Sequence, residues 1–295
     1  MDDSGFNLSR ARIAIIGLGL MGGSLALAIK DHCRELIGVE TDSASLAFAQ
    51  HHNLIQRTTD FHSALTDSDI LILATPVRVI LQQLAVIGNQ YSFINPLVIG
   101  HWSLIIDLGS TKTSITAAMQ TLPANFDPLG GHPMCGKETG GIQNADPNLY
   151  RGKTFVLCPL ERTSPQALSL AQELVSVIGA TPLILSAEQH DSYAALISHL
   201  PYTLAAALMR TALANDHPAL WQMAASGFRD TTRLAASDLT MITDVLLTNR
   251  TALLETLTQY KSELDSLTAA IESGDAVTLH AALESAQRKR SELFK

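Results

Sequence analysis

The stretch Ile13-Ala-Ile-Ile-Gly17-Leu-Gly19-Leu-Met-Gly22-Gly23 places the pattern GxGxxG between a short apolar run and a helical one. In that position the pattern is typical of dinucleotide binding, and a plain glycine-rich turn is the alternative. The first glycine permits a tight turn, the second lets the backbone approach a pyrophosphate, and the third lets helix pack on strand. We therefore expect a cofactor to lie against Gly17, Leu18, Gly19, Leu20, Met21 and Gly22.

Apolar runs alternate with helical patterns from this stretch to about residue 186. We expect strands at Arg12–Gly17, Glu35–Glu40, Ile70–Ala74, Leu104–Leu108, Thr154–Cys158 and Pro182–Leu185. We expect helices at Met21–Lys30, Ser43–His52, Val77–Ile87, Lys112–Gln120 and Gln166–Ile178. Strands that are apolar throughout and separated by helices predict a parallel sheet covered on both faces. The predicted class is α/β, with a doubly wound Rossmann-type sheet in a dinucleotide-binding domain at residues 1–186.

Strand-like runs are absent from the pattern after about Leu185. Long helical stretches replace them at Glu188–Leu213, Asp238–Gly274 and Val277–Leu293, and Pro201 should kink or split the first. This predicts an all-helical C-terminal domain at residues 187–295. We expect it to bind substrate and to form a homodimer, with a helical cap on a monomer as the alternative.

Composition excludes several classes of protein. The 295 residues are 46% hydrophobic and 16% charged, which is a globular and not a disordered composition. The net charge is −8 and neither half of the chain is basic, so no nucleic-acid partner is expected. The uncharged run Ile13–Ile29 is rich in glycine, so no membrane span is expected.

The cysteines and the first residues indicate a compartment. Cys33, Cys135 and Cys158 show neither a disulfide framework nor the spacing of metal ligands, so we expect no metal site. The N-terminus is acidic where a signal peptide needs positive charge. Both observations favour the reducing cytoplasm.

Residues after the second and third strands bear on the cofactor. Glu40 lies near the distance of about 20 residues expected for an acid that binds the ribose. A carboxylate there repels a 2′-phosphate and no arginine follows, so NAD is preferred over NADP. Alternatively, Glu40 only flanks the next helix, with Asp42 or Ser43 as its cap. Thr75 and Pro76 leave the third strand at the edge where ligands bind, although Pro76 also suits a first helical turn.

Further motifs could carry chemistry. Asp107–Lys112 (DLGSTK) ends a strand, and the glycines of residues 130–141 (GGHPMCGKETGG) surround one histidine. That glycine density predicts a loop wrapped closely around a ligand. The helical half adds His190-Asp191, ISHLP at Ile197–Pro201 and SGFRDTTR at Ser226–Arg233.

In their order, GLGLMGGSLA, DLGSTK, GGHPMCGKETGG, ISHLP and SGFRDTTRLAASD resemble the prephenate and arogenate dehydrogenase family of tyrosine biosynthesis. The resemblance covers approximately residues 12–260. It implies a small-molecule substrate, prephenate or arogenate, which is a cyclohexadienol with a ring carboxylate. It also implies an oxidative decarboxylation, in which hydride passes to the nicotinamide, CO2 departs and the ring becomes aromatic.

The resemblance also implies two catalytic residues. His132 matches the histidine that hydrogen-bonds the substrate hydroxyl, and an imidazole suits a general base near pH 7. Without the family pattern, His132 could be an ordinary loop histidine whose hydrogen bonds are satisfied. Ser110 matches a serine that hydrogen-bonds the same centre, and it could also cap the following helix.

Substrate binding is implied for four side chains, Arg233, His199, Tyr202 and Glu138. Arg233 matches an arginine that binds a substrate carboxylate, which suits a fixed guanidinium. Arg229 is a second candidate, or simply an ion pair to Asp230. Glu138 matches a gating acid, or is a solvated loop carboxylate. His199 lies at the substrate end of a helix, or is a core histidine with satisfied hydrogen bonds.

The chain departs from the family pattern at several points. Tyr202 stands where some prephenate-preferring relatives carry histidine, which weakens the case for prephenate over arogenate. Ile242 stands where some relatives place an aromatic residue that reaches the partner subunit's site. Asp191 could orient a buried polar group near His199. Residues 89–103, with Trp102, have no function that we can assign.

Two other functions remain open at this point. A β-hydroxyacid dehydrogenase needs a catalytic lysine in a glycine-rich helix, but the helical half offers only Lys261, Lys289 and Lys295. A nicotinamide-binding sensor without turnover predicts a broken catalytic set, whereas the chain retains His132, Ser110 and Arg233.

Overall fold

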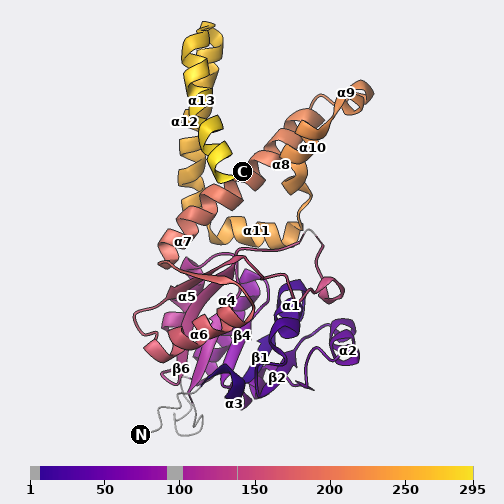
Figure 1. Ribbon diagram of the computed structural model, residues 1–295, viewed down its shortest axis with the longest axis vertical. Coiled ribbons are helices and arrows are strands. Elements are labelled where there is room, and N and C mark those ends of the chain that lie inside the picture. Colours follow the sequence, from indigo (N-terminus) through magenta and orange to yellow (C-terminus); the bar gives the residue numbers. More distant parts are fainter. Residues whose placement is uncertain (1–6, 92–101, 138, 295) are drawn as a thin grey trace.

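The computed structural model describes residues 7–91, 102–137 and 139–294. In these residues an eight-stranded sheet has the order β3-β2-β1-β4-β5-β6-β7-β8. Its strands are β1 (Arg12–Ile16), β2 (Glu35–Val39), β3 (Arg57–Thr58), β4 (Ile70–Leu73), β5 (Ser103–Asp107), β6 (Phe126–Pro133), β7 (Thr154–Pro159) and β8 (Thr181–Ile184). The order 3-2-1-4-5-6 is that of the doubly wound dinucleotide-binding fold. The predicted fold class is therefore confirmed (Figure 1).

Helices cover both faces of the sheet. They are α1 (Leu20–Ile29), α2 (Ser43–His51), α3 (Phe61–Asp67), α4 (Val77–Tyr91), α5 (Thr113–Gln120) and α6 (Pro165–Val177), with short 3-10 turns η1 (Leu8–Arg10) and η2 (Ile142–Asn144). Ile13 and Ile15 of β1 pack into the core under α1 and α6, whereas Ala14 and Ile16 pack into the core under α3, α4 and α5. Each central strand is thus buried on both sides, which explains its continuous apolar sequence.

The sheet is not parallel throughout, and the prediction of a purely parallel sheet is wrong at one edge. β7 runs antiparallel to β6, and β8 runs parallel to β7. The centre of β7 is buried on both faces, like that of a parallel strand. A run of apolar residues reports burial but not strand direction, so the sequence pattern could not distinguish the two.

Residues 126–133 form the strand β6, although the glycines of this region predicted a loop from Gly130. β6 lies between β5 and β7, and Gly131 pairs with Leu157 of β7. A Cβ atom on Gly131 would lie 2.5 Å from the carbonyl oxygen of Asp107. The glycine therefore serves close strand packing, and the loop prediction is wrong up to Pro133.

The helical part follows β8. It comprises α7 (Ala187–Ala194), the π-helical turn η3 (Ala195–His199), α8 (Leu200–Leu213), α9 (Pro218–Met223), α10 (Ser226–Thr232), the 3-10 turn η4 (Arg233–Ala236), α11 (Leu239–Thr248), α12 (Arg250–Ser273) and α13 (Ala276–Leu293). The interruption predicted at Pro201 takes the form of η3, which leaves Pro201 in the first turn of α8. A proline is tolerated there because first-turn N–H groups lack helical partners.

Two arms extend away from the sheet (Figure 1). One consists of α12 and α13 and the other of α8, α9 and α10, while α7 and α11 lie next to the sheet. α11 packs on α4, where Arg78 forms an ion pair with the buried Asp244. Within the described residues no helix is long and apolar enough to span a membrane.

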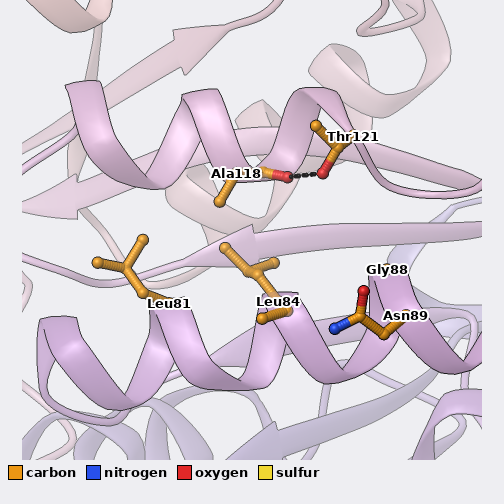
Figure 2. A pocket seen from close by; sticks show the side chains of 7 residues that line it. Leu81, Leu84, Gly88, Asn89, Ala118 and Thr121 are labelled. Atoms are coloured by element: carbon orange, nitrogen blue, oxygen red, sulfur yellow. Dashed lines mark hydrogen bonds between the residues drawn. The ribbon is translucent and has the colours of Figure 1, made fainter.

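A pocket lies between α4 and α5 (Figure 2), lined by Leu81, Leu84, Ala85, Gly88, Asn89, Ala118 and Thr121. It extends toward the C-terminal ends of these helices, so it lies away from the edge where the strands end. Beside the undescribed residues 92–101, Trp102 is half-buried and its Nε1 donates to Oδ2 of Asp127 at 3.1 Å. Trp102 thus has a hydrogen-bond partner in β6, and the rest of the segment 89–103 lies largely outside the described residues.

Candidate active site

The glycine-rich turn between β1 and α1 has the geometry that its sequence predicts. Gly17 has φ +96°, and a Cβ there would lie 2.8 Å from the Thr75 side chain. A Cβ on Gly22 would lie 1.9 Å from the carbonyl oxygen of Gly17, so helix and turn touch only because Gly22 has no side chain. Around Gly19 nothing described lies within 4 Å of such an atom. The open space at Gly19 is where a pyrophosphate would approach the backbone.

The N-terminus of α1 completes this site. Gly19 is its N-cap and supplies no side-chain hydrogen bond to the first turn. The first N–H groups of a helix have no intrahelical partner and attract anions. Leu18 is buried, while Leu20 and Met21 are half-buried. The residues present therefore fit a dinucleotide whose pyrophosphate lies on the first turn of α1.

Glu40 directly follows β2 and reaches the glycine-rich turn after β1. Its Oε2 accepts a hydrogen bond from the backbone nitrogen of Leu18 at 2.8 Å, and its Oε1 accepts one from Thr41 at 2.7 Å. Asp42, and not Glu40, caps α2 by accepting from Ser45 at 2.8 Å. The carboxylate of Glu40 is thus held at the glycine-rich turn, where a ribose role requires it.

Thr75 and Pro76 follow β4 beside this turn. The hydroxyl of Thr75 donates to Oε1 of Gln83 at 3.1 Å. Pro76 is exposed, and its carbonyl accepts from Ile80 in the first turn of α4. Pro76 therefore directly precedes α4, and its predicted contact with a cofactor stays a prediction.

A buried ion pair lies at the C-terminal end of β5. Lys112 and Asp107 are both fully buried, and Nζ of Lys112 donates to Oδ2 of Asp107 and, at 2.6 Å, to the carbonyl of Gly131. Asp107 also accepts from the backbone nitrogens of Gly109 at 2.8 Å and Gly131 at 3.0 Å. Burial raises the pKa of Asp107, which Lys112 and both amides oppose. The pair fixes the turn after β5 against β6, one residue before His132.

His132 is the first member of a hydrogen-bonded chain of three side chains. Its Nδ1 lies 2.7 Å from Nε2 of His190, and Nδ1 of His190 lies 2.8 Å from Oδ1 of Asp191. Burial raises the pKa of Asp191, but hydrogen bonds from His190, Thr113 and Lys112 outweigh it and leave that pKa below its usual value. An ionised carboxylate only accepts, so His190 carries its proton on Nδ1. With its Nδ1 proton directed to Asp191, His190 has Nε2 free to accept from Nδ1–H of His132.

The tautomer that follows leaves Nε2 of His132 without a proton and able to accept one. Burial lowers the pKa of His132 well below 6.5, and the nearby His190, Lys112 and His199 lower it further. The ring is therefore neutral near pH 7. His132 is half-buried, and among the described residues its Nε2 has no hydrogen-bond partner. This arrangement suits a general base.

Asp191 also caps a helix of the sheet part. Its carboxylate accepts from the backbone nitrogens of Lys112 at 2.7 Å and Thr113 at 2.8 Å, at the start of α5. Lys112 occupies the N-cap position, so the alternative that Ser110 caps this helix is wrong. Ser110 is half-buried in the turn between β5 and α5. Its hydroxyl is thus not committed to the cap.

His199 lies in η3 and is only 2% exposed. Its Nδ1 lies 3.1 Å from Nδ2 of Asn249, which also donates to the carbonyl of Asp191 at 2.7 Å. Burial lowers the pKa of His199, Asp191 raises it and His190 lowers it, and together they leave that pKa at about 4. His199 is therefore neutral near pH 7, and its Nδ1 has a hydrogen-bond partner in Asn249.

Two family models together match most of the chain, from residue 25 to residue 285. A prephenate dehydrogenase nucleotide-binding domain matches residues 25–183, and a prephenate dehydrogenase dimerization domain matches residues 186–285. The chain belongs to the prephenate dehydrogenase family. A prephenate dehydrogenase of Bacillus subtilis is 33% identical over 97% of this chain and 77% of its own length.

Two solved structures of the family are similar in fold. The prephenate dehydrogenase of A. aeolicus, in complex with hydroxyphenyl propionate and NAD+, has a TM-score of 0.86 at 27% identity and covers 98% of this chain and 100% of its own. The arogenate dehydrogenase of Synechocystis has a TM-score of 0.80 at 30% identity and covers 96% and 99%. The relatives thus include enzymes named for both substrates.

The other residues that the prephenate dehydrogenase family pattern implied lie as follows. Tyr202 is half-buried in the first turn of α8, and Arg233 is exposed at the start of η4. Glu138 lies outside the described residues. Arg229 forms the plainer ion pair, with its Nε 3.1 Å from Oδ1 of Asp230. The substrate-binding roles of Arg233, Tyr202 and Glu138 stay predictions.

Two residues of this site had no assigned role from sequence. His190 was noted only as a neighbour of Asp191, and Asn249 was not noted at all. Both are buried, but His190 lies in the largely polar helix α7 and Asn249 at the junction of α11 and α12, so the sequence around them gave no clear signal. Ile242, at the position of the partner-reaching aromatic, is buried on α11. No cluster of metal-ligating side chains occurs in the described ranges.

Proposed function

We propose that this chain is a dehydrogenase that oxidatively decarboxylates prephenate or arogenate with NAD, in tyrosine biosynthesis. The observation that carries the proposal is His132, a neutral ring whose Nε2 accepts while His190 and Asp191 hold its other nitrogen. The ring stands at the strand edge that also carries the glycine-rich turn. A base and a nucleotide site at one edge are the parts that this reaction needs.

The residues that would hold NAD are the first turn of α1, with Gly19, and Glu40 at the ribose. A bound nicotinamide supplies the acceptor for the hydride. His132 takes the proton of the substrate hydroxyl at Nε2 as the carbonyl forms. The bond between the ring and its carboxyl group then breaks, CO2 leaves and the ring becomes aromatic. In this proposal Ser110 orients the hydroxyl, and Arg233, His199 and Tyr202 bind the remainder of the substrate.

We also propose that residues 1–186 form the dinucleotide-binding domain and residues 187–295 the substrate-binding and dimerisation domain. The matched dimerization model supports a homodimer. So do the large apolar side chains exposed along the helical part, among them Leu196, Ile197, Met223, Leu239, Leu254, Ile271, Val277 and Leu293. Surfaces of this kind are usually covered in an oligomer. Free Cys33, Cys135 and Cys158 support a cytoplasmic location.

A two-by-two steady-state assay tests the function. The purified chain is given prephenate or arogenate with NAD or NADP, and the absorbance of the reduced nicotinamide is followed. We expect turnover with NAD, and the faster substrate decides between prephenate and arogenate. The absence of turnover in all four combinations would overturn the proposal in favour of a β-hydroxyacid dehydrogenase or a nicotinamide sensor.

A further inference from the structure

We propose that Asn249 is a positioning residue that fixes neutral His199 as a hydrogen-bond donor, at Nε2, to an anionic oxygen of the substrate. The proposal deepens the function proposed above and rests on it. It assigns a task to a residue outside the sequence motifs. It also gives the two histidines opposite tasks: Nε2 of His132 accepts a proton, and Nε2 of His199 donates a hydrogen bond.

The position of Asn249 is tightly determined. It lies at the junction of α11 and α12, is 4% exposed, and its backbone nitrogen donates to the carbonyl of Val245. Its Nδ2 reaches two acceptors, the backbone carbonyl of Asp191 at 2.7 Å and Nδ1 of His199 at 3.1 Å. The amide nitrogen has two hydrogens, so it can satisfy both at once.

The orientation of the amide follows from one of those partners. A backbone carbonyl only accepts, so the atom of Asn249 that faces Asp191 must be the nitrogen and not the oxygen. A flipped side chain would place two oxygens against each other inside the protein. The second hydrogen of the amide then points to Nδ1 of His199, which must accept it. Neutral His199 therefore carries its proton on Nε2.

That proton has no acceptor among the described residues, because no hydrogen bond is formed by Nε2 of His199 there. Nε2 of His199 is not among the fully enclosed polar atoms that lack a partner, so a substrate oxygen can reach it and accept its hydrogen bond. Hydrogen bonds through His190, Asp191 and Asn249 connect His132 to His199, so both rings belong to one site. Asp191 orients both rings, since its carboxylate binds His190 beside His132 and its carbonyl binds Asn249 beside His199.

Neutral donation has a consequence for substrate affinity. The groups that face His199 are Asp191, His190 and His132, and the pKa of His199 is lowered to about 4. The ring does not change charge between about pH 5.5 and about pH 9. Its contribution to substrate binding should therefore be independent of pH over that range.

Nitrogen-15 NMR of the full-length protein tests the tautomer without any turnover. Histidine ring nitrogens are labelled, and the signals of His199 are assigned by their loss in His199→Gln. We expect a protonated Nε2 and an unprotonated Nδ1 at pH 7. The opposite tautomer in the wild-type protein would overturn the proposal, even if every Asn249 variant failed to fold.

Kinetics of Asn249→Asp supplies the second test. The new carboxylate accepts from Nδ1–H of His199 and raises its pKa, so at high pH the neutral ring turns its lone pair toward the substrate. KM for the preferred substrate should rise about tenfold or more between about pH 6 and about pH 9, with kcat changing less. The KM of wild type, and of the control Asn215→Ala on an exposed asparagine, should stay level.

The outcomes separate this proposal from the function on which it rests. A level KM in folded Asn249→Asp, equal to that of wild type, would overturn the role of Asn249 while the dehydrogenase activity stands. Wild-type protein that turns over neither prephenate nor arogenate would overturn the function instead. In that case the NMR result still decides the tautomer of His199.

Discussion

The carboxylate of Asp191 lies 2.7 Å from the backbone nitrogen of Lys112 and serves as the cap of α5, although the two residues belong to different parts of the chain. A helix N-terminus is stabilised by a negative charge and by an acceptor for its free N–H groups. Here both come from the helical part. The helix that follows the turn with Ser110 is therefore capped only when the two parts are packed together.

Asp191→Asn should destabilise the protein. The amide brings a donor against the N–H groups of Lys112 and Thr113, so we expect a loss of about 1–3 kcal/mol in the free energy of unfolding. Urea unfolding measures it, and Glu188→Gln, an exposed acid on the same helix, is the control. An unfolding free energy equal to that of wild type would contradict the cap.

Gly19→Ala should weaken the binding of NAD, whereas Gly22→Ala should lower the stability of the fold. A Cβ at position 19 meets nothing within 4 Å, so the melting temperature should hold while NAD binding weakens by about tenfold or more. A Cβ at position 22 would lie 1.9 Å from the carbonyl oxygen of Gly17, so that variant should lose stability. Calorimetric titration with NAD and thermal unfolding measure the two effects. Unweakened binding by Gly19→Ala would remove the pyrophosphate from this turn.

Glu40→Ala should relax the choice of cofactor. The carboxylate at the glycine-rich turn repels a 2′-phosphate, so its removal should raise kcat/KM for NADP relative to NAD. The ratio of the two values is the measurement, and Asp42→Ala, which removes the cap of α2, is the control. An unaltered ratio counts against a ribose role for Glu40.

His132→Asn should lower kcat by about 10²- to 10⁴-fold, which is the usual contribution of a positioned general base. The affinity for NAD should be unchanged, because no part of the glycine-rich turn is altered. The exposed His280 provides the control His280→Asn. Full turnover by His132→Asn would exclude His132 as the base.

Acidification should destabilise the folded protein through His199. Its pKa is about 4 in the folded protein, against the 6.5 of an unperturbed histidine, so the unfolded chain binds the proton first as pH falls. The stability held above pH 6.5 is therefore lost between pH 6.5 and about 4, by about 3 kcal/mol. Unfolding free energies of wild type should fall more steeply over this range than those of His199→Gln. Equal slopes would show that His199 is not held neutral.

Local signals predicted much of the nucleotide site. The turn at Gly17, the open position at Gly19 and the close contact at Gly22 each follow from one short stretch, and each is confirmed in the structure. The six predicted strands were also found within one residue of their expected bounds. These features depend on neighbours in the sequence, which is why a single chain was sufficient.

Features that depend on distant neighbours were missed. Gly131 resembled a loop residue because glycine more often marks a turn than a close contact between strands. The link from His132 to His190 joins residues 58 positions apart, and only the packing of the helical part on the sheet creates it. Asp191 was expected to orient a buried polar group, but Asn249 could not be connected to His199 without the fold.

β6 carries His132 between β5 and β7, with Gly131 pressed against the backbone of Asp107. His132 itself pairs with Val156 of β7, so the imidazole is carried by a paired strand and not by a loop. Little reorganisation is needed to aim it, which is the condition under which polar groups contribute most to lowering a barrier. Substitutions that loosen the neighbouring strands should slow the reaction without touching any ligand, so the activity of this protein should respond to the integrity of its sheet.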